Sequence, residues 1–283
     1  MCRPMPQPLT AELRERTVTA PGIAELSFAM RSPERLAFRA GQFVSIAVPP
    51  ADAGAPAVPR RSYSIASQSD AGDVLRFIIR IIPEGMATNF LMSLPIGAVV
   101  SMTGPHGFFV LDAAHPGDVV FGATGTGIAA VMPMLGELAR LPAEPDAGRR
   151  LVLWGARHET DLCARAEVEA LAARADAELA VHLTAPPPGW TGGLGRITPA
   201  LLARLPALRA PTFYLVGNGA MITELKHDLT ARGVNRKTQI RTAALFISEG
   251  NARHFRLRED RIEVFATGKP EELVKTIRLA GGH

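Results

Sequence analysis

At the centre of the chain stands Phe121-Gly122-Ala123-Thr124-Gly125-Thr126-Gly127-Ile128-Ala129-Ala130, a glycine-rich turn that joins an apolar run to a segment with helical spacing. In a parallel sheet, such a turn presents the free amides at the start of a helix to the phosphates of a dinucleotide. It serves equally well as a tight connection between a strand and a helix. The stretch therefore predicts a buried strand followed by a helix, and it leaves the ligand open.

A second turn of the same kind follows further along the chain. It reads Tyr214-Leu215-Val216-Gly217-Asn218-Gly219-Ala220-Met221-Ile222. Strand-like and helix-like segments alternate between the two turns, a pattern typical of a parallel sheet with helices on both faces. Because such sheets bind ligands at the carboxyl ends of their strands, we expect the two turns to face one crevice.

The first part of the chain has a different texture, with short β-rich runs between clusters of Gly, Pro, Asp and Ser. Runs of this length and composition favour a small antiparallel barrel. The strands are expected at 24–30, 42–48, 62–65, 75–82 and 99–102.

The change of texture near residue 115 predicts two domains and an extension. An antiparallel β-barrel over 1–115 precedes a Rossmann-like α/β domain, with a parallel sheet, over 116–246. Residues 247–283 are too few for a further domain, and we expect them to form a hairpin followed by a helix at 270–279.

Composition and charge narrow the function classes. The 283 residues carry 31 Lys and Arg against 27 Asp and Glu, and the net charge of +4 is spread evenly, so no nucleic-acid groove is predicted. The longest uncharged run, 119–136, contains glycines and Pro133, which indicates a strand, a turn and a helix rather than a membrane span. The N-terminus lacks the apolar core of a signal peptide, so we expect a cytoplasmic protein without membrane contact.

The barrel half contains the run Arg60-Arg61-Ser62-Tyr63-Ser64-Ile65-Ala66-Ser67. It combines guanidinium groups suited to a pyrophosphate, a flat ring suited to stacking, and hydroxyl donors for the polar edge of a heterocycle. A strand with a basic edge has the same composition. Downstream, Gly85-Met86-Ala87-Thr88 is expected to open a helix whose free amides, with the Thr88 hydroxyl, form a second anion site.

Several motifs follow one another along the chain: Arg61-Ser-Tyr63-Ser64, Gly85-Met-Ala-Thr88, Gly104-Pro-His-Gly107, Gly125-Thr126-Gly127-Ile-Ala, Arg157, Gly-Arg196-Ile and Gly217-Asn218-Gly-Ala-Met221. Each motif alone is unspecific. In their order and spacing they resemble the ferredoxin–NADP reductase superfamily, especially the bacterial ferredoxin/flavodoxin reductases and the reductase components of oxygenases. The resemblance extends over about residues 15–246.

The resemblance implies a flavin-binding barrel that holds FAD, and a second domain that holds NADH or NADPH, with the flavin ring between them. Tyr63 would stack on the flavin and Ser64 would approach its reactive nitrogen, which makes these two the catalytic candidates. Arg61 would hold the pyrophosphate. Further flavin contacts are expected from Arg80, Gly85 and Thr88. The expected nucleotide-binding residues are Thr124, Gly125, Thr126, Gly127, Arg157, Arg196, Gly217, Asn218 and Met221.

Two departures from the family pattern concern the reaction centre. Many members carry Cys before the glycine at 217, where this chain has Val216. Many also end in an aromatic residue over the flavin, after a strand that contains Glu. Here the strand reads Arg241-Thr242-Ala243-Ala244-Leu245-Phe246, lacks Glu and continues into the extension, so either Phe246 or the extension is expected to cover the flavin.

The coenzyme is expected to be NADH, or to be weakly discriminated. In relatives that use NADP, a Ser or Thr followed by Arg commonly stands after the strand at 179–183, whereas this chain has Thr184-Ala185. Arg157 and Arg196 remain as candidates for a 2′-phosphate, because a dianion needs charge-assisted partners.

The preferred function is that of a NAD(P)H-dependent flavin oxidoreductase, which passes hydride to FAD and then single electrons to a separate carrier. Cys2 and Cys163 are too few for an iron–sulfur cluster, so the electrons must leave to a partner such as a ferredoxin, a flavodoxin or an oxygenase component. No metal is needed. The alternative is a flavin-binding sensor or assembly subunit with suppressed turnover. A Rossmann dehydrogenase without flavin is disfavoured by the barrel.

Overall fold

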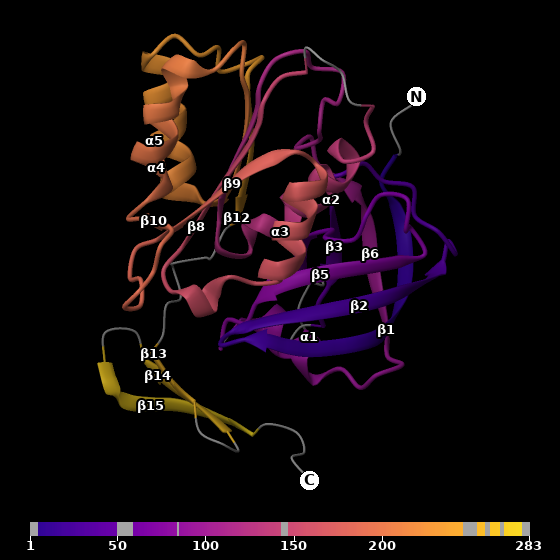
Figure 1. The fold of residues 1–283 in the computed structure, drawn as a ribbon. Coiled ribbons are helices and arrows are strands. Elements are labelled where there is room, and N and C mark those ends of the chain that lie inside the picture. Colours follow the sequence, from indigo (N-terminus) through magenta and orange to yellow (C-terminus); the bar gives the residue numbers. More distant parts are fainter. Residues whose placement is uncertain are drawn as a thin grey trace.

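The computed structural model describes residues 5–49, 59–83, 85–142 and 147–245, together with the backbone of three strands in the C-terminal extension. Two six-stranded sheets form the body of the molecule (Figure 1). The antiparallel barrel-like sheet and the parallel sheet with its helices confirm the fold class predicted from the sequence.

The antiparallel sheet has the strand order β4-β3-β6-β1-β2-β5. Its strands turn alternate side chains inward, so that Phe28, Val44 and Phe77 share one buried core. The strands are β1 (Gln7–Ala20), β2 (Ile23–Ser32), β3 (Phe43–Ala47), β4 (Arg60–Ser64), β5 (Val74–Arg80) and β6 (Val99–His106). The short helix α1 (Met86–Ser93) follows β5.

Strand β1 is the element that the sequence pattern conceals. It pairs with both β2 and β6 and lies inside the sheet, although Glu12, Arg14, Glu15 and Arg16 interrupt its apolar alternation. Its inward residues are small or aliphatic, and the charged residues lie toward solvent or pair with one another, as Arg14 does with Glu12 at 3.1 Å.

The parallel sheet has the order β10-β9-β8-β7-β11-β12. Successive residues of a central strand face opposite helix layers: Phe121 packs with α2 and α3, whereas Val120 packs with α4 and α5. Its strands are β7 (Val119–Thr124), β8 (Arg150–Ala156), β9 (Ala177–Leu183), β10 (Gly193–Leu194), β11 (Thr212–Asn218) and β12 (Ile240–Leu245). Its helices are α2 (Ile128–Leu138), α3 (Arg165–Arg174), α4 (Ile197–Arg204) and α5 (Gly219–Ala231).

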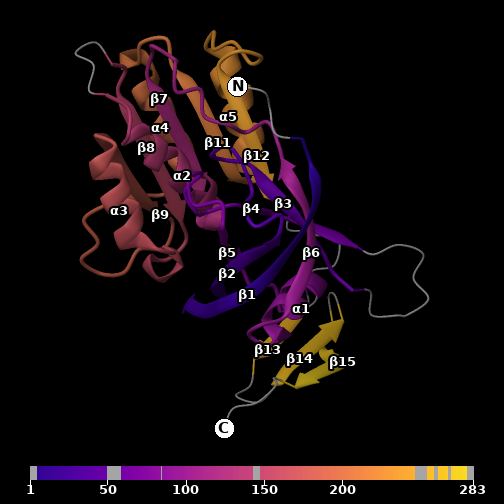
Figure 2. The same cartoon turned by 90° about the vertical axis from the view of Figure 1, so that its right-hand side faces the viewer.

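Helix α2 lies between the parallel sheet and the barrel (Figure 1 and Figure 2). Every residue of this helix except Glu137 is buried. One hydrophobic cluster contains α2 together with barrel-side residues such as Ile23, Ile78 and Phe109. Burying a side chain of this size stabilises the folded state by roughly 1.5–3 kcal/mol, so the two sheets are joined by a real core.

Helices of the described ranges are all too short or too polar to cross a membrane.

The extension contributes a separate antiparallel sheet of β13 (His254–Leu257), β14 (Arg261–Ala266) and β15 (Lys269–Arg278). The hairpin formed by β13 and β14 was expected, but the helix predicted at 270–279 is wrong. The helical spacing of that segment is overridden by pairing along β14, which suits its β-branched residues Val274, Thr276 and Ile277. Phe246 lies outside the described residues.

Candidate active site

A cleft of about 1860 Å³ lies where the barrel meets the carboxyl ends of the parallel strands. Sites for one small ligand usually have about 300–1,000 Å³, so this cleft has room for two. Most of the residues predicted from the sequence line it. They are Arg61, Tyr63, Ser64, Arg80, Thr124, Gly125, Thr126, Arg157, Arg196, Gly217, Asn218 and Met221.

Three predicted residues do not line the cleft: Gly85, Thr88 and Gly127. Thr88 is only 4% exposed, and its hydroxyl donates to the carbonyl oxygens of Ile82 at 2.7 Å and Gly85 at 3.1 Å and accepts from the Ile82 amide at 3.2 Å. This hydroxyl therefore holds the turn before α1, and a phosphate contact by Thr88 stays a prediction of the resemblance. Gly127 is buried against the backbone of β11, where a side chain would collide.

Edge strand β4 supplies the barrel side of the cleft. It pairs with β3 so that Tyr63 stands opposite Val44 and Arg61 opposite Ile46. The Tyr63 ring lies 6.4 Å from the Phe77 ring in the barrel core. Burial raises the pKa of Tyr63 to about 12 despite the nearby Arg61, so the phenol is neutral at all physiological pH values. Tyr63 therefore offers a flat, uncharged surface to a ligand.

The two glycine turns of the parallel sheet are bonded to each other. The Asn218 amide donates to Thr124 Oγ1 at 2.8 Å, which ties the end of β11 to the end of β7. The Asn218 side chain also accepts from the Ala220 and Met221 amides and caps α5. Gly217 has φ +119°, and a Cβ there would collide with Thr124. The turns thus form one rigid rim.

Gly125 and Gly219 provide the open part of this rim. A Cβ on either glycine would meet nothing within 4 Å, so these positions leave space that a ligand can fill. No side chain caps the start of η1 (Gly125–Gly127) or of α2, which leaves backbone amides for an anion. Trp154 fixes the turn from beneath, since its Nε1 donates to the Gly125 carbonyl at 3.0 Å.

Charge in the cleft strongly favours anionic ligands. Asp161 is the one carboxylate among the described lining residues, and it is paired with Arg80 at 3.4 Å. Seven cationic side chains line the same space: Arg60, Arg61, Arg80, Arg157, Arg196, Lys237 and Arg241. Lys237 and Arg241 were not predicted, although Arg241 sits near the start of β12, and the carboxyl end of a strand is where sequence reasoning looks for ligands.

The segment after β6 was also missed. It runs from the barrel to the parallel sheet along the cleft, and Phe109 packs on Tyr214 with ring centroids 5.9 Å apart. The Asp112 amide donates to the Tyr214 hydroxyl at 2.9 Å and fastens the crossing. Consecutive Phe108 and Phe109 after the Gly104–Gly107 motif are the signal that could have found it, because Phe108 is 75% exposed beside the cleft.

These residues fit two dinucleotides. An edge strand with arginines and a neutral tyrosine faces glycine turns with free amides, and the cleft is wide enough for a flavin and a nicotinamide nucleotide together. The fold and the site therefore define a two-domain flavin reductase that uses a nicotinamide nucleotide.

Comparison with known proteins agrees with this class. Residues 10–111 match the family model of the oxidoreductase FAD-binding domain, and residues 121–227 match that of the oxidoreductase NAD-binding domain. The chain is similar to ferredoxin–NADP reductase B of Sorangium cellulosum, with 31% identity over 234 residues that cover 80% of this chain and 92% of the relative.

Two further relatives show how widely the fold is used. The anthranilate 1,2-dioxygenase electron transfer component of Acinetobacter baylyi is 32% identical over 143 residues, which cover 50% of this chain and 38% of that protein. The crystal structure of a cytochrome P450 reductase from Amycolatopsis superposes with a TM-score of 0.71 at 27% identity, covering 84% of this chain and 69% of that one. This chain belongs to the ferredoxin–NADP reductase superfamily and is an oxidoreductase that binds FAD and a nicotinamide nucleotide.

Proposed function

We propose that the chain takes hydride from NADH onto its FAD and releases single electrons to a separate redox protein: a ferredoxin, a flavodoxin or an oxygenase component. The proposal depends above all on the shared cleft, into which β4 of the barrel and both glycine turns of the parallel sheet open. The names of the relatives from Sorangium cellulosum and Acinetobacter baylyi support a carrier of this kind.

The protein's part in the reaction is to orient its ligands. FAD, when bound, accepts a hydride and gives up electrons one at a time. Tyr63 supplies a neutral stacking surface backed by the barrel core, and Ser64 supplies a hydroxyl next to it. Arg61 offers a guanidinium for the pyrophosphate. The amides around Gly125 and Thr126 are the binding groups for the phosphates of the nucleotide.

Proton chemistry in the cleft needs no dedicated side chain. Asp161 is held by Arg80, and Tyr63 keeps its proton to about pH 12. With Val216 before Gly217 and Ala243 and Ala244 in β12, the described rim is uncharged at these positions. Hydride transfer, which moves a proton and two electrons together, suits such a rim.

Anaerobic rapid mixing tests the proposal. The purified protein is mixed with NADH or NADPH, and bleaching of the flavin absorbance is followed. The expected rate lies within the usual catalytic range of about 1–10³ s⁻¹. Adding a ferredoxin or flavodoxin with cytochrome c should then give carrier-dependent reduction of the cytochrome, with the carrier-free mixture as control. Retention of flavin without bleaching would favour the sensor alternative.

A further inference from the structure

Strand β5 has two different sides. Leu75, Phe77 and Ile79 lie in the barrel core. Because side chains alternate along a strand, Arg76, Ile78 and Arg80 lie on the other side. Ile78 is 6% exposed and belongs to the hydrophobic cluster that contains α2. The outer side of β5 is therefore a contact surface for the nucleotide domain.

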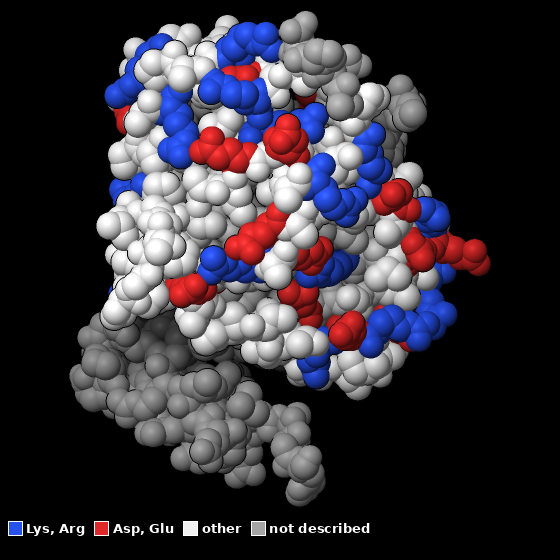
Figure 3. Space-filling model, in the orientation of Figure 1, with Lys and Arg blue, Asp and Glu red and all other residues white. Residues whose placement is uncertain are grey.

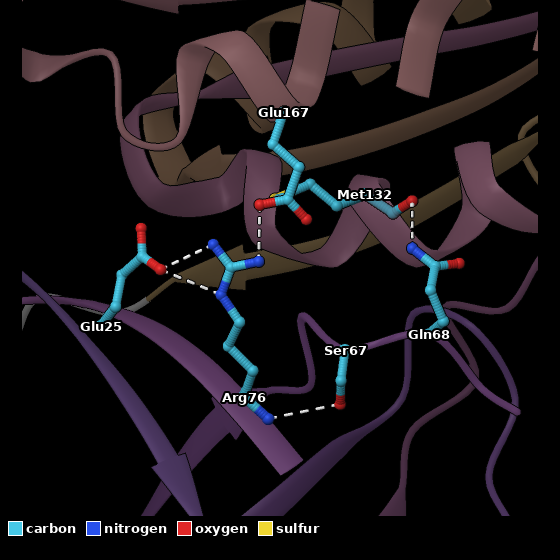
Figure 4. A network of polar contacts seen from close by, with 6 residues as sticks. All are labelled: Glu25, Ser67, Gln68, Arg76, Met132 and Glu167. Carbon is cyan, nitrogen blue, oxygen red and sulfur yellow. Dashed lines mark hydrogen bonds and ion pairs between the residues drawn. The ribbon is translucent and has the colours of Figure 1, made fainter. Parts of the chain in front are cut away.

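Arg76 lies between two carboxylates that come from different domains (Figure 4). Its Nε and Nη2 donate to Glu25 Oε2 on β2 at 2.9 and 2.6 Å. Its Nη1 donates to Glu167 Oε2, in the first turn of α3, at 2.6 Å. We name the set Glu25, Arg76 and Glu167 the Arg76 bridge. On the face shown in Figure 3, acidic and basic side chains lie side by side where α3 adjoins the barrel.

The Arg76 bridge is well ordered by its surroundings. The Arg76 side chain is 23% exposed and that of Glu25 is 19% exposed. Burial lowers the pKa of Arg76, but the hydrogen bonds to Glu167 and Glu25 outweigh it and raise the value above the usual one. Four residues along β5, Arg80 makes the longer contact of 3.4 Å to Asp161, just before α3. Both arginines thus hold the same segment of the nucleotide domain.

A second group of contacts holds the opposite flank of the interface. Ser69 donates to Glu137 Oε1 at 2.8 Å, and Gln68 donates to the Met132 carbonyl at 3.5 Å, both on α2 (Figure 4 shows Gln68). The Gln68 amide lies where a Cβ on Gly136 would be. With Ile78 between the two flanks, α2 and α3 are pinned to the barrel at separate points.

We propose that Arg76 and Glu167 are positioning residues for hydride transfer, which set how far the nucleotide-binding rim stands from the flavin side of the cleft. The inference rests on the proposed function. Neither residue lines the cleft, so they act through placement. The segment that Glu167 anchors begins at the end of β8, where Arg157 and Asp161 line the cleft. Reacting atoms must approach to about 3–3.5 Å, and a displacement of 1 Å costs roughly a hundredfold in rate.

The test compares two isosteric changes on one helix. Glu167→Gln weakens the Arg76 bridge, whereas Glu169→Gln, two residues on, weakens only the pair with Arg165 at 2.8 Å within α3. At saturating NADH, Glu167→Gln is expected to slow flavin reduction roughly tenfold or more, with the Kd for NAD⁺ within about twofold. Glu169→Gln should leave both quantities within about twofold of the wild type.

Hydrogen exchange gives a readout that does not depend on turnover. Amides of β5 and of the first turn of α3 should exchange faster in Glu167→Gln than in Glu169→Gln. Arg76→Lys keeps the charge but cannot reach both carboxylates in a fork, so it should reproduce the Glu167→Gln result and serves if that variant is poorly folded.

Each outcome decides something different. Equal reduction rates in Glu167→Gln and Glu169→Gln, with faster exchange in the former, overturn the positioning role and leave the proposed function intact. Equal exchange in both variants overturns the bridge itself. A wild-type flavin that neither coenzyme bleaches overturns the proposed function, and the positioning role with it.

Discussion

The starts of α1 and α2 both follow a glycine and a Thr that resemble an anion site, and the structure uses them differently. Before α1, a Cβ on Gly85 would meet Thr88 Oγ1 at 2.7 Å and Ile82 at 3.0 Å, and the Thr88 hydroxyl is fully engaged by backbone groups. Before α2, Gly125 has open space on its Cβ side, and Thr126 lines the cleft.

The difference teaches what a glycine-and-hydroxyl motif does and does not encode. Both motifs start a helix, because both leave the chain free to turn and supply a polar group beside unpaired amides. Whether the hydroxyl remains for a ligand depends on the preceding strand: the end of β5 curls back and takes up Thr88, whereas β7 continues straight into the Gly125 turn. We describe the α1 start as closed and the α2 start as open.

Gly217 is the most closed glycine of the cleft, and substituting it has the largest expected effect. Gly217→Ala combines φ +119° with a collision against the side chain and backbone of Thr124. Strain and overpacking together should lower the free energy of unfolding by about 2–5 kcal/mol, measured by urea titration. Gly125→Ala, with φ +53° and open space, should lose only about 1–2 kcal/mol. Equal losses would contradict the division into closed and open turns.

Flavin retention should depend on Arg61 more than on Thr88, because the closed turn has no hydroxyl to spare. Arg61→Ala removes a charge-assisted contact of about 1.5–3 kcal/mol, so the flavin Kd should rise roughly tenfold to a hundredfold. Fluorescence of released flavin on dilution measures it. If Arg61→Ala copurifies with full flavin and unchanged affinity, the role given to that motif is wrong.

Thr88→Val compared with Thr126→Val tests the two starts directly. Thr88→Val leaves buried backbone groups of Ile82 and Gly85 without their partner, so the free energy of unfolding should fall by about 1–3 kcal/mol. Thr126→Val, in the open turn, should change it by less than about 0.5 kcal/mol and weaken NADH binding instead. Calorimetric melting and nucleotide titration provide the two numbers. A stable Thr88→Val variant that loses flavin would make the α1 start open after all.

The open rim also determines coenzyme choice, with a smaller effect. Arg196 is paired with Glu224 at 2.5 Å, and Ala185 stands where NADP-using relatives commonly carry Arg. We expect NADH to be preferred, or the two coenzymes to be used alike, in kcat/KM. A preference for NADPH above roughly tenfold, about 1.4 kcal/mol, would contradict this and point to Arg157 and Arg196 as ligands of the 2′-phosphate.

A tyrosine titration should show the smallest change. The chain has two tyrosines. Burial raises the pKa of Tyr63 to about 12, and burial also raises the pKa of Tyr214. Phenolate absorbance of the folded protein should therefore stay low as the pH passes 10, while the urea-unfolded chain titrates there. Since the unfolded chain loses these protons first, stability should fall as the pH rises from about 10 towards 12. A phenolate step near pH 10 in the native protein would show that Tyr63 or Tyr214 is solvated.

The sequence predicted those parts of the fold in which periodicity and punctuation agree. The alternation of β5 and the glycine turn after β7 both reveal their surroundings, since a strand with one buried face must alternate and a strand-to-helix turn needs small residues. Charged residues conceal β1, and the pairing partner of 270–279 is a neighbouring strand that local spacing does not report. Long-range pairing is invisible to a window of a few residues.

The site was predictable as a set of motifs but not as a geometry. Tyr63 and Gly125 come together as expected because edge strand and parallel turn meet at one cleft. Thr88 carries the right hydroxyl, yet a backbone carbonyl six residues earlier takes it. Lys237 and Phe108 reach the cleft from connecting segments, where no periodicity marks a side chain as facing a ligand.

Helix α2, buried on every side between two sheets, has a consequence for how the molecule melts and how it can be cut. Removing either sheet would expose Met132, Leu135 and their neighbours to water, so neither half has a complete interior without the other. The chain should therefore show a single cooperative thermal transition in place of two. It cannot be divided into an exchangeable flavin module and an exchangeable nucleotide module: a chimaera made at the end of β6 must import α2 together with the barrel surface that covers it.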